Sequence, residues 1–218
     1  MRANGPLLVT GFEPFDGHGI NVSWEVANRL HGTSIGPTHW LAVRLACRFG
    51  ACIDELTEAI ERFTPCAILC LGQAEGRDAV SVERVAINVR DARIADNAGY
   101  QPLNEPVVAD GPFAYPSRLP VQALVSRLRA EGHRIALSNT AGTFVCNDLF
   151  YGLMHRTQQN PVPAGFIHLP VLPEQVRDAS QRSEARDDAP ITGTRTPSLA
   201  LAEQIVTINK LGALLFDP

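Results

Sequence analysis

The sequence predicts an α/β fold: a single domain over residues 1–218 in which a mixed, mostly parallel sheet carries helices on both faces. Short apolar runs typical of strands alternate with longer segments of helical periodicity along most of the chain. No internal repeat and no long linker divides this pattern, and 218 residues with 45% hydrophobic content can enclose one sizeable core. One layered domain is therefore the expected architecture.

The first third of the chain supplies the first strands and two helices. Apolar runs predict strands at 7–10, 41–46 and 67–71, and helical periodicity predicts helices at 22–30 and 51–63. The second helix carries an apolar stripe of Ile53, Leu56, Ile60 and Phe63. It is expected to end at Thr64-Pro65, because proline disfavours helical backbone in the residue before it.

The rest of the chain continues the alternation around two irregular segments. Strands are expected at 80–89, 134–138 and 166–171, and helices at 122–130, 147–155 and 198–211. Residues 91–115 are rich in Pro, Gly, Asn and Asp and predict a loop, and the polar segment 174–196 predicts a surface loop. The last helix is expected to turn Leu201, Ala202, Ile205 and Ile208 inward and to end at Gly212.

Composition narrows the possible classes of protein. A net charge of −4 argues against a nucleic-acid binder, and the chain has neither a run of 18 apolar residues nor a signal-peptide pattern. We therefore expect a cytoplasmic protein that does not contact membranes. The odd count of five cysteines favours free thiols, and Cys66 and Cys70 lack the spacing of a zinc site, so no structural metal is expected.

One cysteine stands where an apolar strand gives way to a helix. The strand 134–138 is followed by a turn at 141–143, and Cys146 falls in the first turn of the helix after it. Unpaired backbone N–H groups at that end favour a thiolate and can hold a developing oxyanion. Cys146 is thus the candidate nucleophile.

A nucleophilic thiol needs a base and a group that orients the base. His168 is the single polar side chain inside the apolar strand 165–170, and Glu83 is a carboxylate inside another apolar strand. A lone histidine in a strand is more often a core residue bonded to backbone, and a lone glutamate is more often half of an ion pair with a nearby arginine. Together with Cys146, they instead predict a catalytic triad.

Blocks of sequence along nearly the whole chain resemble the pyroglutamyl peptidase type I family. They are Thr10–Phe15, Asn21–Glu25, Leu71–Arg77, Glu83–Asn88, Ala92–Asn97, Thr140–Asn147, Leu149–Met154 and Gly165–Pro170. The family's triad occurs in the order Glu, Cys, His, which matches Glu83, Cys146 and His168. The resemblance implies a cysteine exopeptidase that removes N-terminal 5-oxoproline from peptides through a thioester, with no metal or organic cofactor.

The resemblance also implies a substrate pocket for a neutral lactam ring. Phe12, Phe15, Ile94, Phe144 and Val145 match ring-binding positions, although core packing beneath the turn is an alternative for the last two. Asn21 and Gln73 match positions near the lactam, where either side chain or backbone could bond it. Arg93 matches an arginine near the triad, which would neutralise the oxyanion or hold Glu83, whereas Arg84 and Arg90 are expected at the surface.

Some positions depart from the family pattern. Val22 replaces a usual proline, Asp16 replaces a common glycine, and Cys47 stands where threonine is usual. If Cys47 lines the pocket rim, a weak thiol donor replaces a hydroxyl and substrate binding should loosen.

Assembly and two rival functions complete the expectations. The family is commonly tetrameric, and the loop 91–115 carries six apolar side chains, so we expect a homo-oligomer, a dimer or tetramer. A class I glutamine amidotransferase uses the same residue types but in the order Cys, His, Glu. A binding protein without catalysis is disfavoured by the complete triad.

Overall fold

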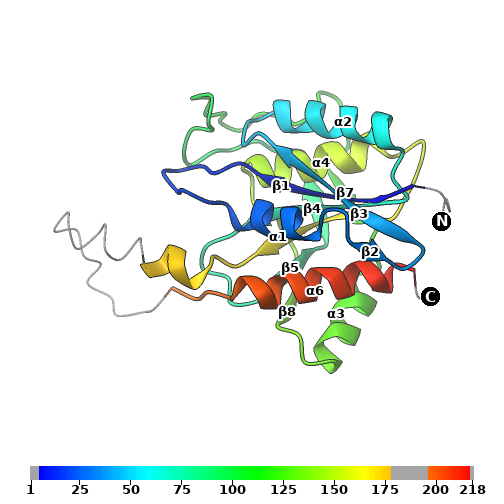
Figure 1. Ribbon diagram of the computed structural model, residues 1–218. Coiled ribbons are helices and arrows are strands. Elements are labelled where there is room, and N and C mark those ends of the chain that lie inside the picture. The colour runs from blue at the N-terminus through cyan, green and yellow to red at the C-terminus, as the bar shows by residue number, and fades with distance from the viewer. Residues whose placement is uncertain (1–4, 178–195, 217–218) are drawn as a thin grey trace.

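A computed structural model describes residues 5–177 and 196–216, and its centre is a seven-stranded sheet (Figure 1). The strand order is β2-β3-β1-β4-β9-β5-β8. Neighbouring strands are parallel except in the pairs β2/β3 and β5/β9. The strands are β1 (Leu7–Phe12), β2 (Ser34–Ile35), β3 (Thr38–Leu45), β4 (Ala67–Gln73), β5 (Val80–Glu83), β8 (Ile135–Ser138) and β9 (Ala164–Leu169).

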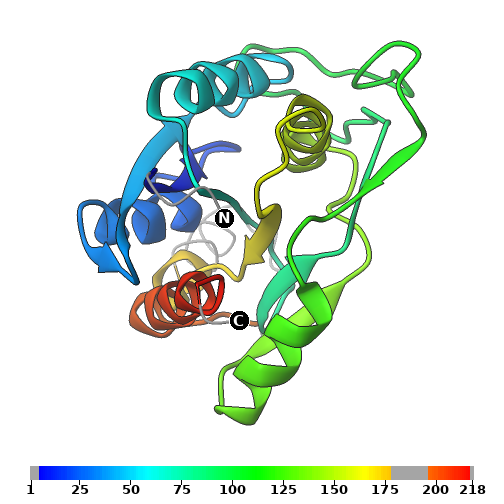
Figure 2. The ribbon, with the colours of Figure 1, turned by 90° about the vertical axis from the view of Figure 1, so that its right-hand side faces the viewer.

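Helices cover both faces of this sheet, as the view in Figure 2 shows, which is turned by 90° from that of Figure 1. One face packs against α1 (Val22–Leu30), α3 (Val121–Ala130) and α6 (Leu201–Leu214). The other face packs against α2 (Ala51–Phe63) and α4 (Val145–Arg156). Each face has its own apolar core, so the α/β fold class predicted from the sequence is confirmed.

Local sequence explains where the first two helices begin and end. Asn21 caps α1, because its side-chain oxygen accepts a hydrogen bond from the backbone N–H of Ser23 (3.1 Å). The helix α2 ends at Thr64, whose left-handed backbone (φ 43°) precedes Pro65. Both helices have the bounds predicted from the sequence. The strand β4, which follows α2 in the chain, is buried over its whole length, as expected for a strand at the sheet centre.

The expected strand 80–89 is divided in two. The chain leaves the main sheet at Arg84, whose N–H donates to the carbonyl of Ser138 (2.8 Å). Beyond it, β6 (Val85–Ile87) pairs with β7 (Ala114–Pro116) in a separate two-stranded sheet. A continuous apolar run cannot reveal such a change of partner, because both halves keep the pattern of a buried strand.

The last helix also differs from its prediction. Gly212 does not end α6 but lies inside it, where a Cβ atom would stand 2.4 Å from Cζ2 of Trp40. The glycine allows close packing of helix on sheet, and α6 continues to Leu214. Ala202, expected to face inward, is exposed, whereas Gln204 and Thr207 are buried.

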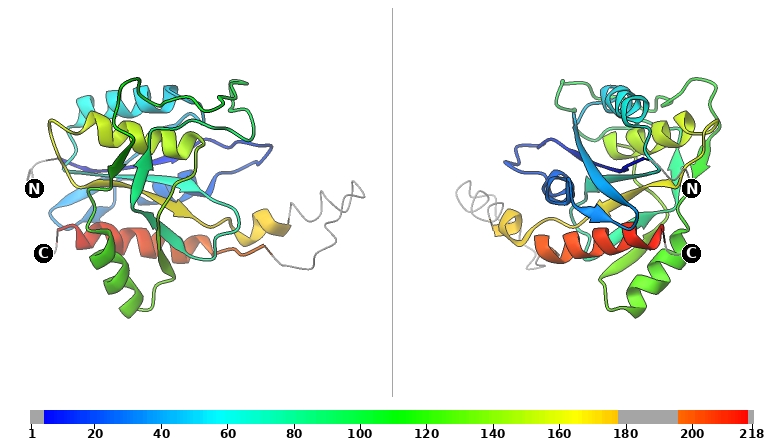
Figure 3. Two further views of the ribbon diagram at one scale, coloured as in Figure 1. Left: turned by 180° about the vertical axis from the view of Figure 1, so that it is seen from behind. Right: turned by 45° about the vertical axis from the view of Figure 1, so that its right-hand side comes forward.

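Two further segments bear on the site. The expected surface loop 174–196 lies largely outside the described residues, and residues 173–177 are helical. The loop 91–115 is irregular, as predicted, apart from the start of β7. Figure 3 shows this loop beside α2 and α4, on the opposite side of the sheet from α6. No helix in the described ranges has the length and apolar character needed to cross a membrane.

Candidate active site

The parallel strands β1, β3, β4 and β9 deliver their carboxyl ends to one edge of the sheet. Cys146 is the second residue of α4, in the first turn of the helix as the sequence predicted, and it lies above this edge. A Cβ atom added to Gly72 of β4 would stand 2.9 Å from the Cys146 sulfur and 2.7 Å from Cζ of Phe166. Gly72 therefore makes room for the thiol.

His168 is the register partner of Gly72 in the pair β4/β9, so it stands next to the residue over which the Cys146 sulfur lies. On its other side, β5 runs antiparallel to β9 and places Ser81 opposite His168. Glu83 follows two residues later on the same face of the sheet, and its Oε1 is 2.8 Å from Nδ1 of His168. Glu83 is fully buried and His168 is nearly so. The three residues proposed as a triad from the sequence thus lie in the same region of the sheet, with Glu83 and His168 in contact and the Cys146 sulfur over the neighbouring Gly72.

Arg77 is a fourth member of this group, which sequence reasoning missed. Its Nη2 lies 3.0 Å from Oε1 of Glu83, the same oxygen that contacts His168. Arg77 lies in the loop 74–79 that follows β4. A buried carboxylate in β5 signals a cationic partner, but the sequence alone offers several arginines for that place.

Burial dominates the ionisation of the thiol and the imidazole. Burial raises the pKa of the Cys146 thiol, as do the nearby Cys47 and Glu83, whereas Arg77 and the backbone N–H of Cys146 oppose the rise. Burial also lowers the pKa of His168, against the opposing effect of Glu83. Both directions favour the neutral thiol and imidazole at rest, although the helix position alone had predicted a thiolate.

A cavity of about 260 Å³ opens next to the triad. Five residues that the sequence assigned to substrate binding line it: Phe15, Gln73, Arg93, Ile94 and Phe144. Asp16, His18, Glu75, Asp91 and Thr143 complete the lining. The rings of Phe15 and Phe144 have centroids 6.0 Å apart, so they form an aromatic wall.

The orientation of the Gln73 amide follows from its hydrogen bonds. Its Oε1 accepts from the N–H of Val22 (3.1 Å) and from Nε2 of Gln175 (2.9 Å). The carbonyl oxygen is therefore turned into the protein, and the NH₂ group is left to face the cavity that Gln73 lines. Sequence reasoning did not identify Gln175.

Other sequence-assigned residues lie outside the cavity lining. Phe12 and Val145 are buried in the core between the sheet and the helices α2 and α4. Asn21 uses its side chain within the protein, because Oδ1 caps α1 and Nδ2 donates to the carbonyl of Glu13 (3.0 Å). Cys47, expected at the rim, is also buried in this core, and burial raises its pKa to about 12.

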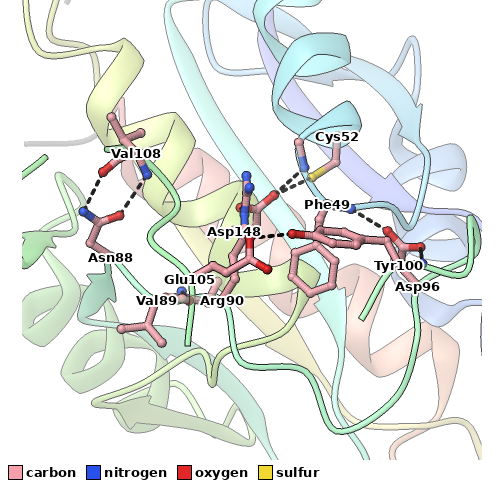
Figure 4. A network of polar contacts seen from close by, with 12 residues as sticks. Phe49, Cys52, Asn88, Val89, Arg90, Asp96, Tyr100, Glu105, Val108 and Asp148 are labelled. Atoms are coloured by element: carbon pink, nitrogen blue, oxygen red, sulfur yellow. Dashed lines mark hydrogen bonds and ion pairs between the residues drawn. The ribbon is translucent and has the colours of Figure 1, made fainter. Parts of the chain in front are cut away.

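A polar network fastens α4 to the loops around the cavity (Figure 4). Asp148, in the first turn of α4, is fully buried and lies 2.6 Å from Nε of Arg90. Its Oδ2 accepts from the N–H of Gly50 (2.8 Å) and contacts the thiol of Cys52 (3.8 Å). Arg90, expected at the surface, is thus the counter-ion of a buried carboxylate.

The same network extends to the cavity wall. Phe49 packs edge-on against Phe144, with ring centroids 5.3 Å apart, and its N–H donates to Asp96 (2.9 Å). The hydroxyl of Tyr100 donates to Glu105, which pairs through its backbone with Arg90. Within residues 5–177 and 196–216, no cluster of three or more His, Cys, Asp or Glu side chains is arranged to hold a metal ion.

Known proteins are similar to this chain in sequence and fold. The model of the family described as pyroglutamyl peptidase matches residues 6–209. A pyrrolidone-carboxylate peptidase from Cupriavidus taiwanensis is 50% identical over 194 residues, which cover 87% of this chain and 89% of that protein.

Solved structures agree over nearly the whole chain. Pyroglutamyl peptidase I from Bacillus amyloliquefaciens has a TM-score of 0.87 and 37% identity, and the match covers 99% of this chain and 98% of that one. Pyrrolidone carboxyl peptidase from Pyrococcus furiosus has a TM-score of 0.89 and 33% identity, with coverages of 97% and 98%. With a family model matched over most of its length and a relative at half identity, the chain belongs to the pyroglutamyl peptidase family of cysteine-type omega peptidases.

Proposed function

We propose that this enzyme hydrolyses the amide bond after an N-terminal 5-oxoproline residue of peptides. The observation that carries the proposal is the His168–Glu83 pair on the strands next to Gly72, over which the Cys146 sulfur lies, together with a small aromatic cavity nearby. The names of the relatives point to the same substrate. The Glu, Cys, His order in the chain also differs from the order Cys, His, Glu of class I glutamine amidotransferases.

In the proposed mechanism, Glu83 orients the base. The Glu83 carboxylate accepts a hydrogen bond from Nδ1–H of His168, which leaves Nε2 of the ring as the proton acceptor. Because burial favours the neutral pair, proton transfer from the thiol to Nε2 accompanies attack of the sulfur on the 5-oxoprolyl carbonyl carbon. The imidazolium then forms next to Glu83, where a negative charge stabilises it.

The tetrahedral intermediate is held at the start of α4. Backbone N–H groups there lack partners within the helix and can donate to the oxyanion, a contribution of about 3 kcal/mol per donor. Arg93 adds a positive charge at the cavity. As the C–N bond breaks, the His168 imidazolium protonates the leaving amine. Water then attacks the thioester, and Cys146 is released with its proton.

The cavity suits a small neutral ring with one polar edge. Its volume of about 260 Å³ lies below the roughly 300–1,000 Å³ of pockets for drug-sized ligands. Phe15, Ile94 and Phe144 provide apolar contact with the ring. The NH₂ of Gln73 supplies a donor for the lactam carbonyl, because its oxygen is already bonded to Val22 and Gln175.

The test is a comparison of two fluorogenic amides that share a leaving group, one 5-oxoprolyl and one prolyl. Proline has no ring carbonyl and carries a charged amine, so it leaves the Gln73 donor unpaired and must bury a cation. A site built to hydrogen-bond a missing group can discriminate by about 10⁴-fold in kcat/KM. Cys146→Ser serves as the control and should abolish turnover. Comparable rates for both amides would contradict the proposed recognition, and retained turnover in Cys146→Ser would contradict the nucleophile.

The same assay distinguishes the rival proposal of a binding protein without catalysis. That protein would bind a 5-oxoprolyl amide without releasing the fluorophore. A neutral thiol and a neutral imidazole at rest do not favour this rival, since proton transfer between them requires only their contact during attack.

A further inference from the structure

Arg77 makes contacts that set it apart from Arg93, the arginine that lines the cavity. Its guanidinium shares one oxygen of Glu83 with the imidazole of His168, at 3.0 and 2.8 Å respectively. The Arg77 side chain is 26% exposed, whereas that of Glu83 is fully buried. The side-chain contacts of Arg77 are with Glu83 and with the carbonyl of Thr140, and Arg77 is not among the residues that line the cavity.

Glu83 depends on Arg77 for charge balance. A buried carboxylate without a counter-ion is strongly disfavoured, and the second oxygen of Glu83 is buried without a hydrogen-bond partner among the described residues. If the imidazole is neutral at rest, Arg77 is the cation that compensates the negative charge of Glu83. The same ion pair limits how strongly Glu83 attracts a proton to His168.

Arg77 also reaches the segment that leads to the nucleophile. Its Nη2 lies 3.4 Å from the carbonyl oxygen of Thr140, in the turn between β8 and α4. That turn continues through Thr143 and Phe144, which line the cavity, to Cys146. One guanidinium therefore touches both the acid of the triad and the loop that precedes the thiol.

We propose that Arg77 is a positioning residue: it holds the Glu83 carboxylate against the ring of His168, ties this pair to the loop before Cys146, and balances the charge of the buried acid. This inference rests on the proposed catalytic role of the triad. The sequence suggested Arg93 as a residue that could hold Glu83. The contacts in the structure give this role to Arg77.

The charges around the triad predict a measurable consequence. The groups that act on His168 are Glu83 from β5 and Arg77 from the loop after β4. Those that act on the Cys146 thiol are Glu83, Arg77 and Cys47, which lies between β3 and α2. The positive charge of Arg77 lowers the pKa of both His168 and Cys146. Its removal should raise both pKa values, so the pH dependence of thiol reactivity should move to higher pH.

The experiment compares Arg77→Gln, Arg77→Lys and Arg84→Gln with the unmodified enzyme. Arg84 is the matched control, because it follows Glu83 in the chain and carries the same charge, yet the contacts described for Glu83 and His168 do not include it. Circular dichroism and urea unfolding confirm that each variant is folded. Two readouts follow: kcat and KM for the 5-oxoprolyl amide against pH, and the rate of Cys146 alkylation by iodoacetamide against pH, located by mass spectrometry.

We expect Arg77→Gln to lower kcat by about 10- to 100-fold, the usual effect of losing a residue that orients a functional side chain, with little change in KM. Both pH profiles should shift upward, Arg77→Lys should restore much of the profile, and Arg84→Gln should match the unmodified enzyme. An unchanged kcat, or a lower kcat with unshifted profiles, would overturn the proposal. Alkylation needs no peptide, so it tests Arg77 even if the 5-oxoprolyl amide proves not to be a substrate.

Discussion

Replacing Arg90 by methionine should destabilise the protein strongly, because the carboxylate of Asp148 would remain buried without its cation. Asp148 is fully buried on α4, and the guanidinium of Arg90, with a side-chain exposure of 17%, is its only ion-pair partner among the described residues. Two other donors, the N–H of Gly50 and the thiol of Cys52, would remain. They stabilise the charge only in part.

The geometry sets the expected magnitude. Unit charges 2.6 Å apart attract by about 6 kcal/mol at an effective dielectric constant of about 20. The desolvation of both groups offsets part of this energy, and removal of one partner from a buried pair usually costs about 3–5 kcal/mol. We therefore expect Arg90→Met to lower the free energy of unfolding by about 3–5 kcal/mol.

The assay is urea unfolding followed by circular dichroism, with Arg156→Met as the matched control. Arg156 is on the same helix and pairs with Glu61, but both side chains are at least half exposed. Loss of such a surface pair should cost no more than about 1 kcal/mol. The comparison separates the effect of a buried charge from the effect of replacing any arginine near α4.

The pH dependence gives a second test with a definite sign. Burial raises the pKa of Asp148, and Arg90 opposes that rise. A carboxyl group whose pKa is raised in the folded state contributes stability at low pH, which is lost as the pH rises through the folded-state pKa. Arg90→Met raises this pKa further. The loss in free energy of unfolding of this variant, relative to the unmodified enzyme, should therefore shrink as the pH falls from 7 towards 5. A loss below 1 kcal/mol, or one independent of pH, would refute the reasoning.

Three further predictions concern the triad, the strand beneath it and assembly. Glu83→Gln should retain more activity than Cys146→Ser, because the amide still accepts a hydrogen bond from His168 although it no longer stabilises the imidazolium; a rate equal to that of the unmodified enzyme would make Glu83 structural. Gly72→Ala should cost about 1–3 kcal/mol in stability and lower kcat, since its methyl group would displace the Cys146 sulfur or the Phe166 ring; unchanged kinetics would show that the thiol has room to move. Light scattering at micromolar concentration should show a dimer or tetramer, since Leu103 and Phe113 are 79% and 75% exposed on the loop 91–115; a strictly monomeric mass would contradict this.

Elements with a strong local signal could be predicted from the sequence. The helices 22–30 and 51–63 have the predicted bounds because the capping side chain of Asn21 and the proline at 65 act within a few residues. Gly212 was misjudged because its role depends on the indole of Trp40, which lies far away in the chain. A glycine near a helix end has the same local pattern whether it ends the helix or packs against a neighbour.

The same contrast between local signals and contacts of distant residues applies to the candidate site. Cys146 has a local signal, since a strand, a turn and a helix surround it in sequence. The partners of Glu83 and Asp148 have no such signal, because the sequence contains several arginines and only the fold decides which one approaches each acid. Arg77 reaches Glu83 from the loop after β4, and Arg90 reaches Asp148 across 58 positions of the chain. Glu83 was detectable as an acid inside an apolar strand, whereas Asp148, inside a helix, was not identified from the sequence.

These two arginines contact the two ends of the chain segment 140–148. Arg77 contacts the carbonyl of Thr140 at the start of the turn, and Arg90 holds Asp148 in the first turn of α4. Cys146 lies between these two points in the chain. The position of its sulfur over Gly72 therefore depends on two guanidinium groups that do not line the cavity. A change at either arginine should alter the reactivity of the thiol before it alters the shape of the cavity for the ring.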